Sequence, residues 1–241
     1  MQTNANQLQT RSQINEDFKL TRPKEINGPV PAFTLGPKIK ADARYFSRWH
    51  DDTPMTRTFS TLAALLTFAM LATIGTGLWS FFLEKGDPIK PDIFLVHFHL
   101  GLWTSIGILL VHCIIFTYFL GTGRWVKEVG IAYRLPDEPL PKRTRELKRA
   151  TFPPALFSML IAIFTSAAGA GVLFQSWPWY CHAAGAILTL VINLWAFRIE
   201  YRDLAANIII LDAVLVEVDR IRQEQGLESN AEAVQRDSAA S

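Results

Sequence analysis

Three long windows of the sequence contain no charged residue, and they constrain the fold more than any other feature. They cover residues 58–83, 93–123 and 150–197 and are filled mainly with aliphatic and aromatic side chains. A helix needs about 20 apolar residues to cross the hydrocarbon core, because each residue adds about 1.5 Å. The first two windows therefore predict one transmembrane helix each, and the third predicts two.

The expected fold is an all-α integral membrane protein, a compact bundle of four transmembrane helices. The predicted spans are 58–83, 93–120, 152–174 and 177–197. The break in the third window is placed at 175–178, where a proline suits the first turn of a new helix. Thr151 and the prolines after it are expected to open span three. One long helix through 150–197 is the competing interpretation.

The segments outside the spans are polar and carry most of the basic residues. We expect residues 1–57 to form a polar tail with a short interfacial helix at 41–50. Residues 121–151 are expected to form a basic loop with a surface helix at 124–134. Residues 198–241 are expected to form an amphipathic helix with a disordered end. Nine Lys and Arg precede residue 58 and eight lie in 121–150. The positive-inside rule then predicts cytoplasmic termini, here in a bacterial inner membrane.

Charge and apolar patterning also indicate the partners. The net charge of +2 gives no reason to expect nucleic acid. The basic cluster at 142–149 can lie against anionic headgroups of the bilayer, as a topology determinant or as a lipid or protein site. The C-terminal helix has an apolar stripe that can pack on its own chain or form a coiled-coil homodimer. The stripe consists of Leu204, Ile208, Leu211, Leu215 and Val218.

Small residues predict close packing of the last two spans. They recur every four residues at Ser158, Ala162, Ser166 and Ala170, and again at Cys181, Gly185, Thr189 and Asn193. The only other cysteine is Cys113, and no CxxC pair occurs, which excludes membrane thiol oxidoreductases.

Histidines are the chemically notable residues of the spans. With charged residues absent from the windows, we expect a bundle interior without carboxylates, which excludes paired-carboxylate catalysis and carboxylate-bridged metal centres. No set of catalytic residues and no protein-only metal site is predicted. The remaining ionisable groups are His97, His99, His112 and His182. Imidazole in a membrane helix is costly and can bind haem iron, copper or zinc.

Helical geometry limits which histidines can act together. At about 100° per residue, His97 and His99 point roughly 160° apart, and His99 and His112 roughly 140° apart. His97 and His112 can share a face but lie about 22 Å apart along the axis. His182 offers a ligand from another helix. Its depth matches His97 when counted from the outer boundary but not when counted from the inner charges, so its partner on span two stays open.

These residues predict a b-type haem held by His182 and one of His97, His99 and His112. Gly101, Gly107 and Gly185 would make room for the macrocycle. The spacing resembles membrane b-type cytochromes, although span four has a single histidine and Trp195 stands 13 residues further on. The pattern therefore supports one bis-histidine haem at most.

Two functions of different classes follow. The first is an electron-transfer subunit of a larger membrane complex, with a membrane or cytoplasmic-side protein as redox partner. The second is a non-catalytic structural or assembly subunit, in which the histidines are hydrogen-bonded packing residues. A transporter is less favoured, because broken helices and charged relay residues near the midplane are absent from the sequence.

Overall fold

Four long helices make up the part of the chain that the computed structural model describes, namely residues 54–83, 91–229, 232 and 236. These helices are α4 (Pro54–Leu83), α5 (Pro91–Ala132), α6 (Leu140–Leu173) and α7 (Trp179–Glu224). No strand occurs among the described residues. The all-α prediction is therefore confirmed for this part, whereas the tail with its interfacial helix at 41–50 lies outside it.

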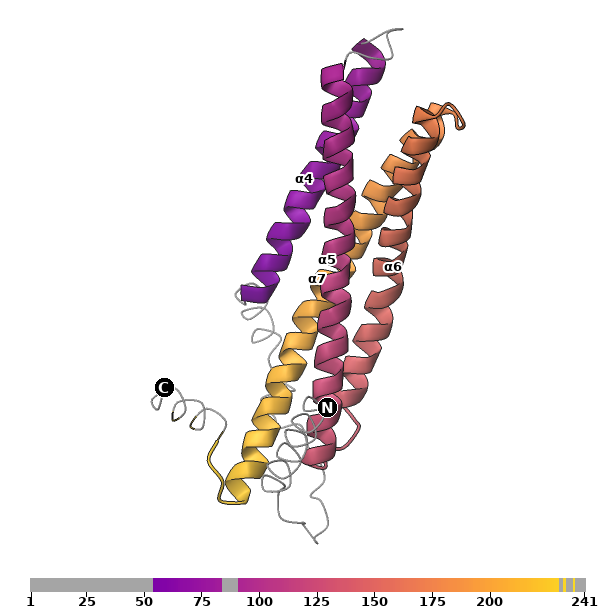
Figure 1. Ribbon diagram of the computed structural model, residues 1–241. Helices are drawn as coiled ribbons and strands as arrows, with labels where there is room; N and C mark the ends of the chain where they lie inside the picture. Colours follow the sequence, from indigo (N-terminus) through magenta and orange to yellow (C-terminus); the bar gives the residue numbers. More distant parts are fainter. Residues whose placement is uncertain (1–53, 84–90, 230–231, 233–235, 237–241) are drawn as a thin grey trace, which may run out of the picture.

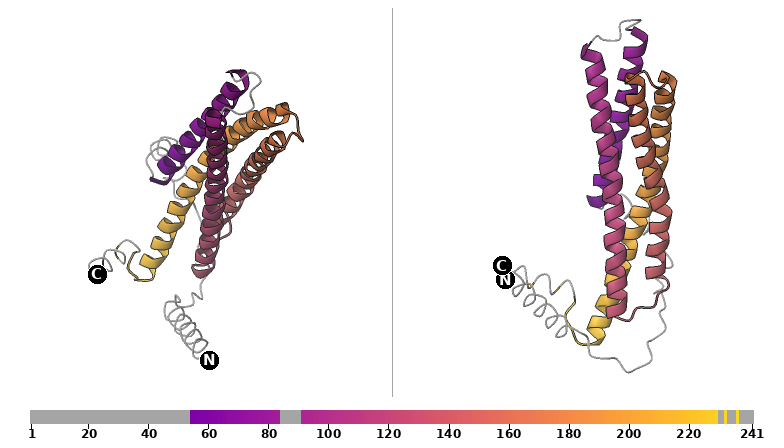
Figure 2. Two further views of the ribbon diagram at one scale, coloured as in Figure 1. Left: turned by 45° about the horizontal axis from the view of Figure 1, so that its top comes forward. Right: turned by 45° about the vertical axis from the view of Figure 1, so that its right-hand side comes forward.

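The helices run up and down in a bundle (Figures 1 and 2). Each helix contacts the next one in the chain, and α7 returns to contact α4, while α5 and α7 have only slight contact. The order around the bundle is thus α4, α5, α6, α7, with α5 and α7 diagonally opposite. The N-terminal ends of α5 and α7 lie at the same end of the bundle (Figure 1).

Three of the helices have the length and composition of membrane spans. They are α4, α5 and α6, over Pro54–Phe82, Ile93–Ala132 and Leu140–Leu173. Large apolar side chains cover their outer surface, among them Phe68 and Trp103, which are 71% and 66% exposed. Such a surface suits lipid, so the chain has the features of an integral membrane protein. A fourth span in α7 and the cytoplasmic orientation of both termini stay predictions.

The break between the third and fourth predicted spans is confirmed, because α6 ends at Leu173 and α7 begins after Pro178. The two helices that carry the stripes, α6 and α7, form the most extensive interface of the bundle. Ser158, Ala162, Gly185 and Thr189 are buried, whereas Ser166 and Ala170 are exposed.

The separate surface helix predicted at 124–134 is wrong, because α5 continues without a break to Ala132. The physical reason is that the apolar face of this stretch stays in phase with the face before it. Phe119 and Val126 are buried in one cluster, and Val129 and Tyr133 pack against it. Continuing the helix therefore extends the core, and the charged residues remain on the outer face.

The predicted start of span three at Thr151 is also wrong, since α6 begins at Leu140 and includes Pro153 and Pro154. Thr151 does not cap a helix. Its hydroxyl bonds the Leu147 carbonyl and Asp203, each at 3.0 Å. The two prolines remove hydrogen bonds to the carbonyls of residues 149 and 150, which are both exposed, so other donors can reach them.

The C-terminal amphipathic helix is continuous with the predicted fourth span. Leu204, Val214 and Val218 are buried in the shared core, while Leu215 is 40% exposed. Polar contacts tie this part of α7 to α5, since Asn207 donates to the Tyr118 hydroxyl at 3.1 Å. The helix thus packs on its own chain, and homodimerisation through it stays a prediction.

The α6–α7 contact gives a stability prediction. A Cβ atom at Gly185 would lie 2.8 Å from the Thr165 hydroxyl and 3.5 Å from its Cα. Gly185→Leu should therefore lower the free energy of unfolding by about 1–3 kcal/mol through overpacking. Gly75→Leu is the matched control, because nothing lies within 4 Å of a Cβ there. Thermal unfolding in detergent measures both, and equal melting temperatures for the two variants would contradict the tight interface.

Candidate functional site

The structure brings together His97 and His182. His97 lies near the N-terminal end of α5 and His182 near that of α7, so the two residues reach each other from diagonally opposite helices. Their ring centroids are 5.9 Å apart, with an angle of 81° between the ring planes. Among the described residues, this is the only pair of histidine rings that contact each other, because the neighbouring ring of His99 is Phe98 and that of His112 is Phe197.

Each imidazole of this pair is held by a backbone carbonyl of the preceding helix. The Nδ1 atom of His97 bonds the Thr73 carbonyl, and the Nδ1 atom of His182 bonds the Thr165 carbonyl, both at 3.0 Å. A carbonyl only accepts, so Nδ1 carries a proton, and in the neutral imidazole the lone pair is on Nε2. Neither Nε2 atom has a hydrogen-bond partner among the described residues. This is the arrangement that orients a histidine for metal binding.

A glycine lies against each ring at the same relative position. A Cβ atom at Gly77 would lie 2.9 Å from Cε1 of His97, and one at Gly169 would lie 2.9 Å from Cε1 of His182. Each glycine lies four positions after the threonine whose carbonyl accepts the histidine bond, Gly77 after Thr73 and Gly169 after Thr165. The α4–α5 and α6–α7 hairpins therefore supply two equivalent halves of one site.

His112 lies in a different, fully enclosed polar cluster. Its Nδ1 atom is 2.6 Å from Oε1 of Glu200, and its Nε2 atom is 3.0 Å from Oδ1 of Asn193. All three residues are fully buried. Phe197 stacks on the imidazole, with centroids 5.5 Å apart.

The hydrogen bonds of this cluster determine where its protons lie. Asn193 donates through Nδ2 to the Thr189 carbonyl at 2.8 Å, so its Oδ1 atom must face His112 and accept. Nε2 of His112 is therefore a donor, and one further proton is shared between Nδ1 and the Glu200 carboxylate. Both ring nitrogens are engaged within the protein, which leaves His112 without a lone pair for iron.

His99 and the cysteines lie apart from both clusters. His99 is exposed on the outer face of α5, where its Nδ1 atom bonds the Leu95 carbonyl of its own helix at 2.8 Å. Cys113 is exposed and Cys181 half-buried. Among the described residues, no three His, Cys, Asp or Glu side chains are grouped so that they could hold a metal ion.

The expectation of an interior without carboxylates is wrong. Glu200 is fully buried, and Asp203 is 1% exposed. Glu200 follows the charge-free window by three residues, so the sequence places it at the end of a span. The signal that could have found it is the buried stripe of α7, because Glu200 continues the helical spacing of Thr189, Asn193 and Phe197.

The glycines beside the histidines were also not identified from the sequence. Gly101, Gly107 and Gly185, predicted to make room for a macrocycle, instead approach residues of neighbouring helices, namely Thr73, Leu66 and Thr165. The shared Thr-x-x-x-Gly spacing before each histidine-bearing helix is the signal that points to Gly77 and Gly169.

Comparisons of the chain with protein-family models, with curated proteins and with solved structures found no match. The paired imidazoles offer two ring nitrogens, and the Thr76 hydroxyl lies 3.4 Å from Nδ1 of His97.

Proposed function

We propose that this chain is a membrane electron-transfer subunit with one b-type haem, whose axial ligands are His97 and His182. The supporting observation is the pair of imidazoles from opposite helices, each with Nδ1 bonded to a carbonyl and Nε2 free, at a centroid separation of 5.9 Å. His97 and His182 would hold the iron through their Nε2 atoms, and the haem would supply one-electron chemistry.

The number of ligands favours haem over a bare metal ion. A structural zinc site needs four protein ligands, and a catalytic one needs three. The described residues contain no such group. Haem iron receives four nitrogens from the porphyrin and needs only two from the protein. A largely apolar macrocycle also suits a bundle whose outer surface is apolar.

Two histidine ligands favour electron transfer over chemistry on a bound substrate. A haem held by both histidines would exchange electrons, because the protein would already supply two nitrogen ligands to its iron. The pair lies at one end of the bundle, which suits electron exchange with a second redox group near that membrane surface. The partner would then be another subunit of a membrane complex.

The structural or assembly subunit remains the second candidate, and the His112 cluster favours it. That histidine is fully used in hydrogen bonds within the protein. If His97 and His182 did no more than bond the carbonyls of Thr73 and Thr165, all three would be packing residues.

Absorption spectra separate the two functions. We expect the full chain, purified from haem-sufficient cells, to show a Soret band, with sharp α and β bands on reduction, and one haem per chain by extraction. A colourless protein would exclude the cytochrome, and two haems per chain would contradict the single bis-histidine site.

A further inference from the structure

A surface groove lies at the opposite, charged end of the bundle, between the end of α5 and the start of α6. It has a volume of about 920 Å³ and extends from Leu120 to Leu135 along α5 and the following turn, and from Pro141 to Lys148 along α6. Gly123 and Gly130 lie in its wall. None of the residues that line the groove belongs to either histidine cluster, so the groove is a separate site.

The groove is strongly basic. Its charged lining residues are Arg124, Lys127, Arg134, Arg145, Lys148 and Asp137, five cations and one anion, which sum to +4. Arg124 is paired with Glu128, which lies outside the lining, at 2.8 Å. The remaining positive charge of the lining attracts anions.

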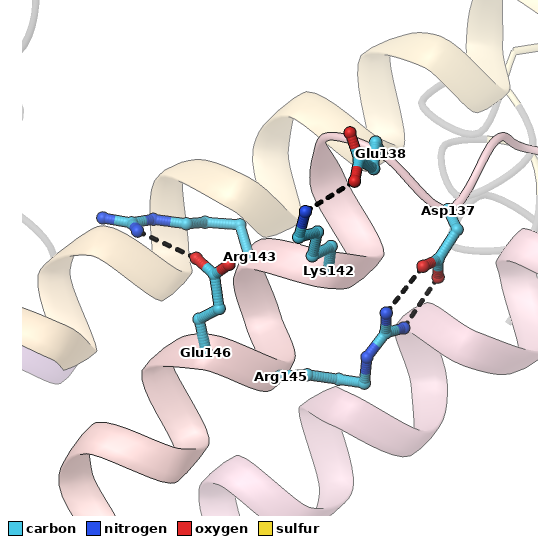
Figure 3. A network of polar contacts seen from close by, with 6 residues as sticks. All are labelled: Asp137, Glu138, Lys142, Arg143, Arg145 and Glu146. Carbon is cyan, nitrogen blue, oxygen red and sulfur yellow. Dashed lines mark hydrogen bonds and ion pairs between the residues drawn. The ribbon is translucent and has the colours of Figure 1, made fainter.

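The one acidic lining residue is already neutralised. Arg145 donates two hydrogen bonds to the Asp137 carboxylate, at 2.7 and 2.6 Å, and these bonds lower the pKa of Asp137 (Figure 3). Lys127 and Lys148, in contrast, have no ion pair with any described residue. Two lysines thus remain for an external anion.

The other acidic side chains of this turn are occupied by neighbours that do not line the groove. Lys142 bonds Glu138 at 2.5 Å, and Arg143 bonds Glu146 at 3.0 Å (Figure 3). They therefore do not compete for the groove lysines.

The position of the groove matches the headgroup level of a bilayer. The charge-free window of α5 ends at Gly123, directly before Arg124, and that of α6 begins at Ala150, directly after Lys148 and Arg149. Apolar residues line the groove beside the cations, among them Leu120 and Val126. A ligand that fits this lining has an anionic head and an apolar chain.

We infer that this groove binds an anionic glycerophospholipid, with its phosphate at Lys127 and Lys148 and an acyl chain along Leu120. A zwitterionic lipid has no net charge to match the lining, and a free anion leaves the apolar part unfilled. The inference goes beyond the proposed haem function and does not depend on it, because the groove lies at the other end of the bundle.

Native mass spectrometry of the full chain in a neutral detergent tests this site. The delipidated protein is titrated with phosphatidylglycerol or with phosphatidylcholine of the same acyl chains. We expect one phosphatidylglycerol to bind preferentially, and K127Q/K148Q to weaken it roughly 20-fold. The matched control is K142Q/R149Q, which removes two positive charges from α6 at the same end of the bundle but outside the groove. This variant should change the affinity for phosphatidylglycerol less than about twofold.

Equal binding of both lipids by the native chain, or equal weakening in both double variants, would overturn the lipid site. Displacement of the lipid by millimolar inorganic phosphate would indicate a free-phosphate site instead. K127R/K148R keeps both charges and should keep the selectivity, which separates loss of charge from loss of folding.

Discussion

Replacing His97 or His182 with alanine should remove the Soret band from the purified chain, whereas His99→Ala should leave it unchanged. Each alanine deletes one of the two proposed axial ligands, and haem content should fall at least about tenfold, because even residues behind a metal ligand change affinity by that factor. His99 is the matched control, since it lies on the same helix but is exposed and bonds only its own backbone. Absorption at equal protein concentration measures the effect.

Folding and ligand loss can be separated in the same variants. Free imidazole added to His182→Ala should restore the band if the site is otherwise intact, and circular dichroism should show unchanged helix content. Retention of the band in a folded His182→Ala would refute the assignment. Loss of the band in a folded His112→Phe, with retention in His97→Ala, would move the haem to the other cluster.

The choice between His97 and His112 shows how far sequence reasoning reaches. Depth counted from the outer boundary pairs His97 with His182, and the structure places these two rings together. Depth counted from the inner charges does not pair them, because Arg124 follows His97 by 27 residues whereas Arg198 follows His182 by 16. An inner charge therefore does not mark a common level in this bundle, since it can lie on the outer face of a continuing helix.

The helices themselves were predictable from the charge-free windows, but their ends were not. Val126 on α5 and Leu147 on α6 are buried in the same core cluster as the residues of the spans, so packing continues both helices into charged sequence. Local signals such as Pro153 or Thr151 indicate a helix start, and tertiary packing overrides them.

The Glu200 carboxylate was hidden for a related reason. Its burial depends on His112, a residue 88 positions earlier in the chain, and no local pattern records that partner. Arg198, two residues before it, is exposed, so the sequence around Glu200 reads as the charged end of a span.

Glu200→Leu should destabilise the protein by about 3–5 kcal/mol, because it leaves the buried His112 without its partner. The pair is fully enclosed, and the second oxygen of Glu200 has no partner among the described residues. Leucine has no polar atom that can share a proton with Nδ1 of His112. Thermal and denaturant unfolding of the purified variant in detergent measure the loss.

The matched variant is Glu200→Gln, whose amide can donate to Nδ1 of a neutral His112 while Nε2 still donates to Asn193. It should stay within about 1 kcal/mol of the native protein, since a neutral hydrogen bond replaces the shared proton. Equal stability of the Leu and native proteins would show that the pair contributes nothing to folding. His112 lies about 22 Å along α5 from His97, so Glu200→Gln should also retain the haem. The stability of the His112 cluster and haem binding at His97 and His182 can then be altered independently.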